Sequence, residues 1–396
     1  MNFKKTIQLL NLVLLLLVLS SCKKHDNDIS DADLPKDSLP MMHPSEKEPS
    51  KLTAAYINKK KAEIESFYNK NWPHNSLNGS FLVAKDGQII YERYEGYSNL
   101  RAKTPITADT PLHLASVSKM VTATAILKLV NANKLKLDQK VNSILKEFPY
   151  PDVTVRMLLN HRSGMRSYSY FTDKKEIWDR HKTITNQQLL TLMATKHIAL
   201  ESKTNTRFAY CNTNYAMLAL IIEKITGLSY KEAMSKIIFK PLGMTNTFVM
   251  DYDKDRKTVV PSYKGNNVEI GMDFLDAIYG DKNIYSTPRD ILKLDQARNA
   301  PSFLEPSLYK QVFEGYSNEH KGKRNYGLGI RMTLLDNGET LYYHNGWWHG
   351  NTSSYVSLRR ENVTLICLSN KFSRKPYDIR KLSALFGDYP FELGDE

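Results

Sequence analysis

The sequence predicts an α/β (α+β) domain with an antiparallel sheet built from N- and C-terminal segments, flanked by helices, and a mostly helical inserted subdomain. Two observations support this prediction. β-rich runs with tight-turn signals occur near both ends of the domain, at 81–91 and 332–368, whereas the part between them, about 109–240, is mostly helical in pattern. Strands and helices in separate blocks favour a sheet with helices packed against it. We place the folded domain at 53–396, which is long enough for a substantial core.

The elements of the first half follow in chain order. A helical pattern covers 52–68. The β-rich runs Phe81–Ala84 and Gln88–Tyr91 flank Asp86-Gly87, and Asp-Gly between such runs is a strong hairpin signal. Further helices are predicted by apolar periodicity at 155–160, 186–194, 215–226 and 229–239.

The C-terminal third is predicted to be mixed. Thr287, Pro288 and Asp290 supply the N-cap, the first-turn proline and the first-turn acid of a helix start. Asn337-Gly338 marks a hairpin turn among β-rich runs, and 377–386 is expected to form a closing helix. The predicted strands are 332–335, 341–344, 354–358 and 363–368.

The N-terminus carries a targeting signal. Two lysines, an apolar core at Leu12–Leu19 and two serines precede Cys22, which is the order of a secretory signal. The ending Leu-Ser-Ser-Cys resembles the lipobox of bacterial lipoproteins and implies cleavage before Cys22 and lipidation of this residue. We therefore expect a signal peptide at 1–21, a flexible tether at 22–52, and an exported protein lipid-anchored to the membrane of the bacterial cell envelope. An uncleaved anchor, or an ordinary signal with an incidental cysteine, is the alternative.

Composition argues against several classes of protein. The net charge is +13, yet the basic residues are scattered, with no run denser than Lys59–Lys61, so we predict no nucleic-acid partner. Cys211 and Cys367 lie in apolar surroundings and are expected to pack as small hydrophobes. The sequence contains neither a Cys-x-x-Cys nor a His-Glu-x-x-His motif, and we predict no metal and no cofactor. It does not predict an oligomeric state.

The strongest chemical signal is Ser116-Val117-Ser118-Lys119 at the start of an apolar helix. Side chains at i and i+3 share one helix face. Lys119 can therefore accept the proton whose loss makes the Ser116 hydroxyl a nucleophile, while the helix N-terminus offers N–H donors to an oxyanion. The same spacing recurs at Ser143–Lys146 and Ser307–Lys310, but neither leads a buried helix. The alternative is that Ser116 merely caps a core helix.

Two further motifs follow this one in the chain, Tyr210-Cys211-Asn212 and His344-Asn345-Gly346. Together the three resemble, in type and order, the motifs Ser-x-x-Lys, Tyr-x-Asn and Lys- or His-x-Gly of the serine hydrolase family of class C β-lactamases and D-alanyl-D-alanine carboxypeptidases. The resemblance covers about 53–385 and implies a β-lactamase/transpeptidase-like, penicillin-binding-protein-like fold. Supporting stretches lie at 153–165, 212–215, 241–244 and 284–288.

The resemblance also implies roles for individual residues. Ser116 attacks a carbonyl and forms an acyl-enzyme, while Lys119 and Tyr210 form the proton relay, either of them serving as the base. Asn212 orients Lys119 or the substrate amide. The backbone N–H groups of Ser116 and Trp347 form the oxyanion hole. The implied substrate-binding residues are Asn212, His344, Asn345, Gly346 and Trp347.

His344 bears on the class of substrate. The β-lactamases of this family usually carry a lysine there, a permanent cation for a substrate carboxylate, whereas a histidine is largely neutral near pH 7. His-x-Gly is similar to family peptidases acting on D-amino acids and to some esterases. Arg359 and Arg360 are candidate carboxylate ligands, although a solvated strand end is the simpler interpretation.

We therefore predict an acyl-serine hydrolase of amide or ester bonds in the cell envelope, and we favour a D-amino-acid peptidase of the carboxypeptidase type or an esterase. Its substrate would be a small peptide, an ester or a β-lactam-like molecule. Three alternatives remain open: a class C-like β-lactamase, a catalytically silent envelope binding protein of the same fold, and a polyanion-binding protein that rests on charge alone.

Overall fold

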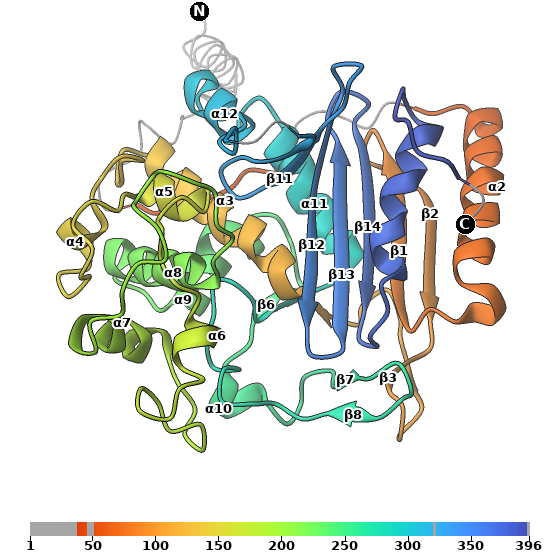
Figure 1. The fold of residues 1–396 in the computed structure, drawn as a ribbon. Coiled ribbons are helices and arrows are strands. Elements are labelled where there is room, and N and C mark those ends of the chain that lie inside the picture. Colours follow the sequence, from red (N-terminus) through yellow and green to blue (C-terminus); the bar gives the residue numbers. More distant parts are fainter. Residues whose placement is uncertain (1–37, 46–50, 320–321, 394–396) are drawn as a thin grey trace, which may run out of the picture.

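The structure, a computed structural model, describes residues 38–45, 51–319 and 322–393. The predicted signal peptide, Cys22 and much of the predicted tether lie outside these residues. Within them, no helix combines the length and the apolar character that a membrane span requires. The described chain is built around one large sheet with helices on both of its faces (Figure 1).

In the described ranges, seven strands form the large sheet in the order β10-β11-β12-β13-β14-β1-β2, and every neighbouring pair is antiparallel. Gly79 of β1 pairs with Ser369 of β14, so strands from both ends of the domain join in one sheet, as predicted. Only the three-residue β10 was not expected. The strands are β1 (Gly79–Lys85), β2 (Gln88–Glu95), β10 (Arg324–Tyr326), β11 (Arg331–Leu334), β12 (Thr340–Trp348), β13 (Asn351–Leu358) and β14 (Val363–Ser369).

The predicted hairpin turn between β1 and β2 is confirmed. Asp86 and Gly87 have φ angles of 50° and 81°, and a two-residue turn with both central residues at positive φ matches the twist of the strands on either side. Such a conformation suits glycine, which has no Cβ, and is tolerated by aspartate. The local sequence therefore fixes the register of this hairpin.

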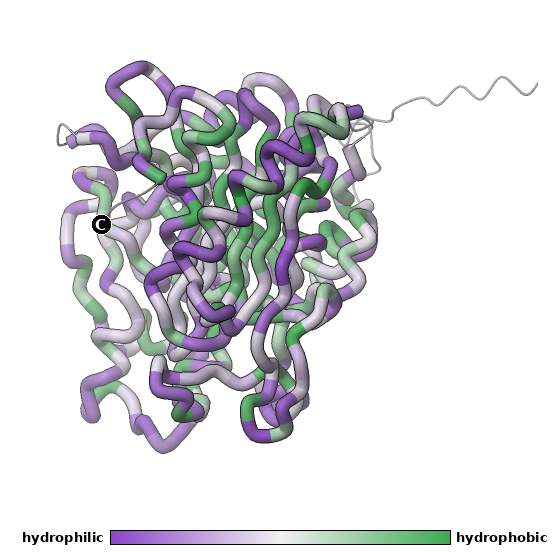
Figure 2. Tube along the Cα trace, turned by 90° about the vertical axis from the view of Figure 1, so that its right-hand side faces the viewer, coloured by the Kyte–Doolittle hydropathy of each residue, from purple (hydrophilic) through white to green (hydrophobic). Residues whose placement is uncertain are grey.

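Helices cover both faces of the sheet (Figure 1). On one face α2 (Ala54–Asn71) and η5 (Lys375–Leu385) enclose a core with inward side chains of β1, β13 and β14. On the other face α3 (Ser118–Asn131) and α8 (Asn212–Thr226) are buried in a larger core. Figure 2 shows the hydrophobic strands behind the more polar outer segments. The predicted closing helix is present, but η5 is a 3₁₀ helix.

The central part is helical, as predicted. Thr287 accepts a hydrogen bond from the Asp290 N–H and starts α11, and α8 ends at the left-handed Gly227. The predicted helix 229–239 begins as α9 and continues as the π-helical η4. The remaining helices are η2 (Pro73–Asn75), η3 (Ala115–Val117), α4 (Val141–Ile144), α5 (Val155–Leu159), α6 (Tyr168–Phe171), α7 (Asn186–Thr195), α9 (Tyr230–Met234), η4 (Ser235–Phe239), α10 (Tyr252–Asp255), α11 (Pro288–Asn299) and α12 (Pro306–Val312).

Short strands, which the sequence analysis did not predict, connect the sheet to the helical part. They form three small sheets, and in one of them, β5-β9-β6, the strand β5 lies just before Ser116 in the chain. Strands of two or three residues are too short for an alternating pattern to appear. The strands are β3 (Tyr97–Asn99), β4 (Thr104–Pro105), β5 (Leu112–His113), β6 (Phe248–Val249), β7 (Ser262–Tyr263), β8 (Glu269–Ile270) and β9 (Ile284–Ser286).

One segment of the predicted tether packs against the domain. Met42 is only 2% exposed, and its backbone N–H donates a hydrogen bond of 2.7 Å to the Ile237 carbonyl. The tether was predicted from a composition poor in large apolar residues, but a single buried methionine can hold a short segment because its burial is worth about 1.5–3 kcal/mol. The folded unit therefore includes 38–45.

Candidate active site

Ser116 lies in the single 3₁₀ turn η3, which leads into α3. Lys119 Nζ donates a hydrogen bond of 3.0 Å to Ser116 Oγ. The Lys119 side chain is fully buried, whereas Ser116 is partly exposed. Neither η3 nor α3 has a side-chain N-cap, so the alternative that Ser116 serves as a helix cap is wrong. The structure thus brings hydroxyl and amine into direct contact at the edge of a buried helix.

The backbone just before Ser116 is held in a strained conformation. Ala115 has a φ of 47°, in the left-handed region that residues with a Cβ rarely adopt. Its N–H donates to His113 Nδ1 at 3.0 Å, and His113 Nε2 donates to Asn283 Oδ1 at 3.1 Å. Burial lowers the pKa of His113 to about 4, so the ring stays neutral near pH 7. A neutral imidazole therefore fixes the turn that presents Ser116.

Lys119 is held by a second acceptor and two aromatic rings. Its Nζ donates to the Asp281 carbonyl at 2.9 Å and lies 5.2 Å from the Tyr210 ring centroid and 5.8 Å from that of Tyr215. The ammonium group is therefore aimed at Ser116 by fixed partners, which reduces the reorganisation needed for proton transfer.

A buried network supports Asp281. The Tyr168 hydroxyl donates to Asp281 Oδ2 at 2.6 Å and accepts from Lys282 Nζ at 2.9 Å. Lys282 is 2% exposed and lies 4.6 Å from the centroid of the Trp348 ring. These contacts position the backbone carbonyl that binds Lys119.

Tyr210 lies in the loop before α8, and an arginine side chain stacks on its ring. The Arg331 guanidinium lies 4.5 Å from the ring centroid. Burial by itself raises the pKa of Tyr210, but the positive charges of Lys119 and Arg331, with hydrogen bonds to Ser116 and Lys119, outweigh it and hold that pKa below its ordinary value of 10. The site therefore favours the phenolate more than water does.

We expect this charge effect to appear in the pH dependence of catalysis. With an activated acetyl ester, kcat/KM should rise with pH as the Tyr210 hydroxyl loses its proton. In Arg331→Met the phenolate loses a stabilising cation, the pKa of Tyr210 rises, and the midpoint of this rise moves to higher pH. Arg359→Met, which removes another ring-stacked arginine, is the control and should leave the midpoint in place. An unchanged midpoint in Arg331→Met contradicts the argument.

His344 is completely buried behind Tyr210, at 6.4 Å between ring centroids. Its Nδ1 donates to the Asn345 carbonyl at 2.9 Å, so Nε2 accepts from the Tyr326 hydroxyl at 3.2 Å. Burial, with the charges of Arg331 and Lys119, holds the pKa of His344 well below its ordinary value. Both ring nitrogens are occupied, so His344 offers no cation to a substrate and instead supports the strand.

The strand that carries His344 has one free edge beside Ser116. β11 pairs with β12 only as far as Tyr343, opposite Arg331, whereas β13 pairs with β12 up to Trp348. Along His344–Trp348, β12 therefore has no strand partner on the β11 side within the described sheet, although the Asn345 carbonyl accepts from His344 Nδ1 and the Gly346 carbonyl from the Tyr377 hydroxyl. Such an edge can hydrogen-bond an extended substrate.

Gly346 touches the nucleophile's own backbone. A Cβ placed there would lie 2.9 Å from Ser116 N and 2.5 Å from the Leu114 carbonyl oxygen. The next residue, Trp347, is 59% exposed, and its ring faces Phe372 at 6.4 Å between centroids. The strand therefore passes close to the backbone of Ser116.

The two asparagines lie at the rim of this arrangement. Asn345 Oδ1 accepts from the Ser354 hydroxyl at 2.8 Å on the neighbouring strand. Asn212 is the first residue of α8, and its buried Oδ1 has no hydrogen-bond partner in the described chain. The implied contact between the Asn212 amide oxygen and Lys119 is therefore absent.

Sequence reasoning missed residues that have no motif of their own. Arg331 is the first residue of a short strand. His113 holds the Ala115 N–H through a ring nitrogen, and Asp281 holds Lys119 through its backbone carbonyl.

Two further sequence predictions concern the arginines and the cysteines. Arg359 stacks on Phe313 and Arg360 pairs with Glu339 and Glu361, away from Ser116. Cys211 and Cys367 are free and buried, which confirms that they pack as apolar groups.

Comparison with known proteins decides the family. The sequence profile described as beta-lactamase matches residues 70–386, most of the chain. The chain belongs to the β-lactamase family. Its relatives in this family are serine hydrolases, and the chain is one as well.

Among these β-lactamase-family relatives is penicillin-binding protein 4* of Bacillus subtilis, 29% identical over 358 residues that cover 84% of this chain and 78% of that protein. A D-aminopeptidase of Brucella anthropi is 27% identical over 80% of this chain, which spans only 64% of that relative's length. The crystal structure of a penicillin-binding protein from Bacillus halodurans matches with a TM-score of 0.71 and 23% identity, covering 80% and 98% of the two chains. This likeness confirms the predicted β-lactamase/transpeptidase-like fold.

Proposed function

We propose that the protein is a D-amino-acid peptidase of the carboxypeptidase type, which uses Ser116 to hydrolyse the amide bond before a C-terminal residue that bears a free carboxylate. The observation that supports this proposal most is the position of Arg331. Its guanidinium stacks on the ring of Tyr210, at the point where the pairing of β11 with β12 ends. An amide hydrolase is also what the D-aminopeptidase and D-amino acid amidase relatives indicate.

The first half-reaction starts with Ser116 Oγ. As Oγ attacks the substrate carbonyl carbon, its proton passes to the relay of Lys119 and Tyr210. The carbonyl oxygen becomes an oxyanion, for which the N–H groups of Ser116 and Trp347 are the donors. The relay then returns the proton to the leaving amine nitrogen, the C–N bond breaks, and an ester between Ser116 and the acyl group remains.

The second half-reaction reverses these proton movements. A water molecule loses its proton to the relay and attacks the ester carbonyl, the same donors receive the oxyanion, and the proton returns to Ser116 Oγ as the acid product leaves. All groups that these steps require come from the protein and water.

The Arg331 guanidinium would bind the carboxylate of the leaving amino acid. Among the described residues no carboxylate forms an ion pair with Arg331, whose guanidinium lies over the rings of Tyr210 and Tyr326. An arginine binds a carboxylate through two parallel hydrogen bonds, which fixes its position as well as its charge. Because Tyr210 lies directly under the guanidinium, a carboxylate bound there holds its own amine next to the group that returns the proton.

The cell envelope is the compartment that we propose for this reaction. The predicted signal at 1–21 and the predicted lipidation of Cys22 would export the protein and keep it at a membrane. Peptides that end in D-amino acids would then be its substrates on that side.

The experiment compares two peptides of identical sequence that end in D-alanyl-D-alanine, one with a free C-terminal carboxylate and one with an amide. We expect kcat/KM to be at least about tenfold higher for the carboxylate, which is about 1.4 kcal/mol. Arg331→Met should make the two peptides equal, and Arg331→Lys should restore part of the difference.

Turnover is followed as release of the C-terminal amino acid by the full chain in detergent, with Ser116→Ala as the blank. Equal rates for the two peptides in the unsubstituted protein would contradict the carboxypeptidase assignment. Faster hydrolysis of a cephalosporin than of either peptide would favour a β-lactamase instead.

A further inference from the structure

Two carboxylates and an imidazole come together where the segment between β8 and β9 meets the turn between β12 and β13. Asp273 and Asp276 belong to this segment, and His349 is the first residue of the turn. A carboxylate oxygen from each aspartate and a ring nitrogen from His349 all lie within 4.8 Å of one another. No short sequence motif reveals this set, because His349 follows Asp276 by 73 positions.

The spacing of these atoms suits a small divalent metal ion. His349 Nε2 lies 2.9 Å from Asp276 Oδ2 and 3.2 Å from Asp276 Oδ1. Two ligands of a tetrahedral zinc ion, with bonds of about 2.0–2.1 Å, lie about 3.3 Å apart. Imidazole and carboxylate groups are both zinc ligands, and a water molecule completes a site with three protein ligands. Asp273 is exposed, so an ion can enter from solvent.

Neighbouring groups already orient the buried carboxylate. Asp276 is only 2% exposed, and its Oδ1 accepts from Trp348 Nε1 at 2.6 Å. Its Oδ2 accepts from the backbone N–H of Asp273. Hydrogen bonds of this kind fix the orientation of a metal-binding carboxylate.

Asn351 gives an independent indication of a ligand at this place. Its side chain is 4% exposed, and its Oδ1 is buried with no hydrogen-bond partner among the described residues. Asn351 pairs with Trp348 across the hairpin, so both side chains lie on the same face of the sheet. It lines a cavity of about 810 Å³ together with Asp276 and His349. A buried amide oxygen without a donor is costly, and the O–H of a metal-bound water would satisfy it.

This cluster is connected to the turn of Ser116. Asn283 Nδ2 donates to the Asp276 carbonyl at 2.5 Å, and Asn283 Oδ1 accepts from His113 Nε2 at 3.1 Å. His113 in turn holds the N–H of Ala115, one residue before the nucleophile. An ion that fixes Asp276 would therefore also fix the Ser116 turn.

We propose that Asp273, Asp276 and His349 bind one divalent transition-metal ion such as Zn²⁺, which positions the Ser116 turn from outside the reacting atoms. Asn351 accepts a hydrogen bond from a water molecule on this ion. The inference is independent of the proposed carboxypeptidase function, because it concerns neither the leaving group nor the acyl group of a substrate.

The test is a titration of the full chain in detergent with Zn²⁺ alone, after treatment with EDTA and dialysis. Calorimetry should show one ion bound per chain. Asp273→Asn and His349→Gln each remove a ligand atom and should weaken binding by about 100-fold or more, while Asn351→Leu should weaken it by about tenfold.

Two further readouts follow the folded state and the nucleophile. An excess of Zn²⁺ should raise the unfolding temperature by about 3 °C or more, because the ion binds only the folded protein. It should also raise kcat for an activated acetyl ester by at least about twofold, with Ser116→Ala as the blank for hydrolysis by the ion itself. Both effects should disappear in Asp273→Asn, whose exposed position makes misfolding easy to exclude by its unfolding temperature.

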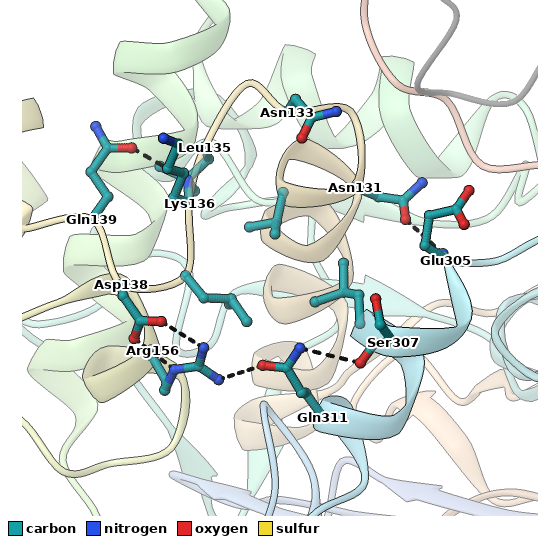
Figure 3. A pocket seen from close by; sticks show the side chains of 13 residues that line it. Asn131, Asn133, Leu135, Lys136, Asp138, Gln139, Arg156, Glu305, Ser307 and Gln311 are labelled. Atoms are coloured by element: carbon teal, nitrogen blue, oxygen red, sulfur yellow. Dashed lines mark hydrogen bonds and ion pairs between the residues drawn. The ribbon is translucent and has the colours of Figure 1, made fainter.

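A second cavity provides the matched control (Figure 3). It has a volume of about 830 Å³ and is lined by the end of α3, the loop that follows it and α12. Its Asp138 carboxylate is already bound by Arg156 through hydrogen bonds of 2.7 and 2.8 Å. Glu305→Gln removes an exposed carboxylate from this lining, and zinc affinity and both shifts should stay as in the unsubstituted protein.

The outcomes separate the site from its effect. Absence of zinc binding, or equal binding by the unsubstituted protein, Asp273→Asn and His349→Gln, overturns the metal site. Zinc that binds and raises the unfolding temperature but leaves kcat unchanged overturns the link to the Ser116 turn.

Discussion

Ser116→Ala is expected to lower the rate of amide or ester hydrolysis by about 10⁴-fold or more, because it removes the proposed nucleophile that forms the acyl-enzyme. Ser116 Oγ accepts a hydrogen bond from Lys119 and caps no helix, so its removal leaves the fold almost unchanged. The measurement is the turnover of an activated acetyl ester, followed by mass spectrometry of the protein for the acyl adduct.

Two controls make the result for Ser116 specific. Ser143→Ala changes a second serine that is followed three residues later by a lysine, and it should retain full activity. Thermal unfolding should show Ser116→Ala within about 1 kcal/mol of the unsubstituted protein. Retained hydrolysis in folded Ser116→Ala, or loss of activity in Ser143→Ala, would refute the assignment of the nucleophile.

Gly346→Ala is expected to reduce kcat by about 10²- to 10³-fold, comparable to the loss of one oxyanion-hole donor. The added methyl group would lie 2.9 Å from Ser116 N and 2.5 Å from the Leu114 carbonyl oxygen, and both are backbone atoms that cannot rotate away. The strand must then move away from η3, which separates the two proposed donors. The KM should change much less than kcat, since the loss falls on the transition state.

Gly322→Ala is the matched control for this substitution. A Cβ at Gly322 would have no heavy atom within 4 Å, and its φ lies outside the range that disfavours side chains. This variant should behave like the unsubstituted protein in both kcat and unfolding temperature. Full activity of Gly346→Ala would show that the strand does not contribute to the oxyanion hole.

The sequence predicted those parts of the fold that local chemistry determines. Asp86-Gly87 adopts the two positive φ angles of its turn, and Thr287 caps α11, because each depends on residues only a few positions apart. The π-helical end of 229–239 and the docking of Met42 depend on tertiary contacts instead. Periodicity and composition do not contain that information.

In the candidate site, too, some residues are predictable from neighbouring sequence and others are brought together only by tertiary contacts. Ser116 and Lys119 could be found because helix geometry places i and i+3 together. Arg331 lies 121 positions beyond Tyr210 in the chain, and the predicted strand began at Met332, one residue too late to include it. The sequence therefore offers Arg359 and Arg360 as candidate carboxylate ligands, because their charge is visible in it and their packing is not.

The free edge of β12 also bears on the solubility of the protein. Unpaired strand edges are sites at which two molecules can join their sheets and aggregate. Here the unpaired run is only five residues long, ends in the turn at His349, where φ is 53°, and stands beside η3, so a second molecule finds little room to pair. Variants that shift η3 away from the strand would lengthen the accessible edge, and they should be screened for self-association as well as for activity.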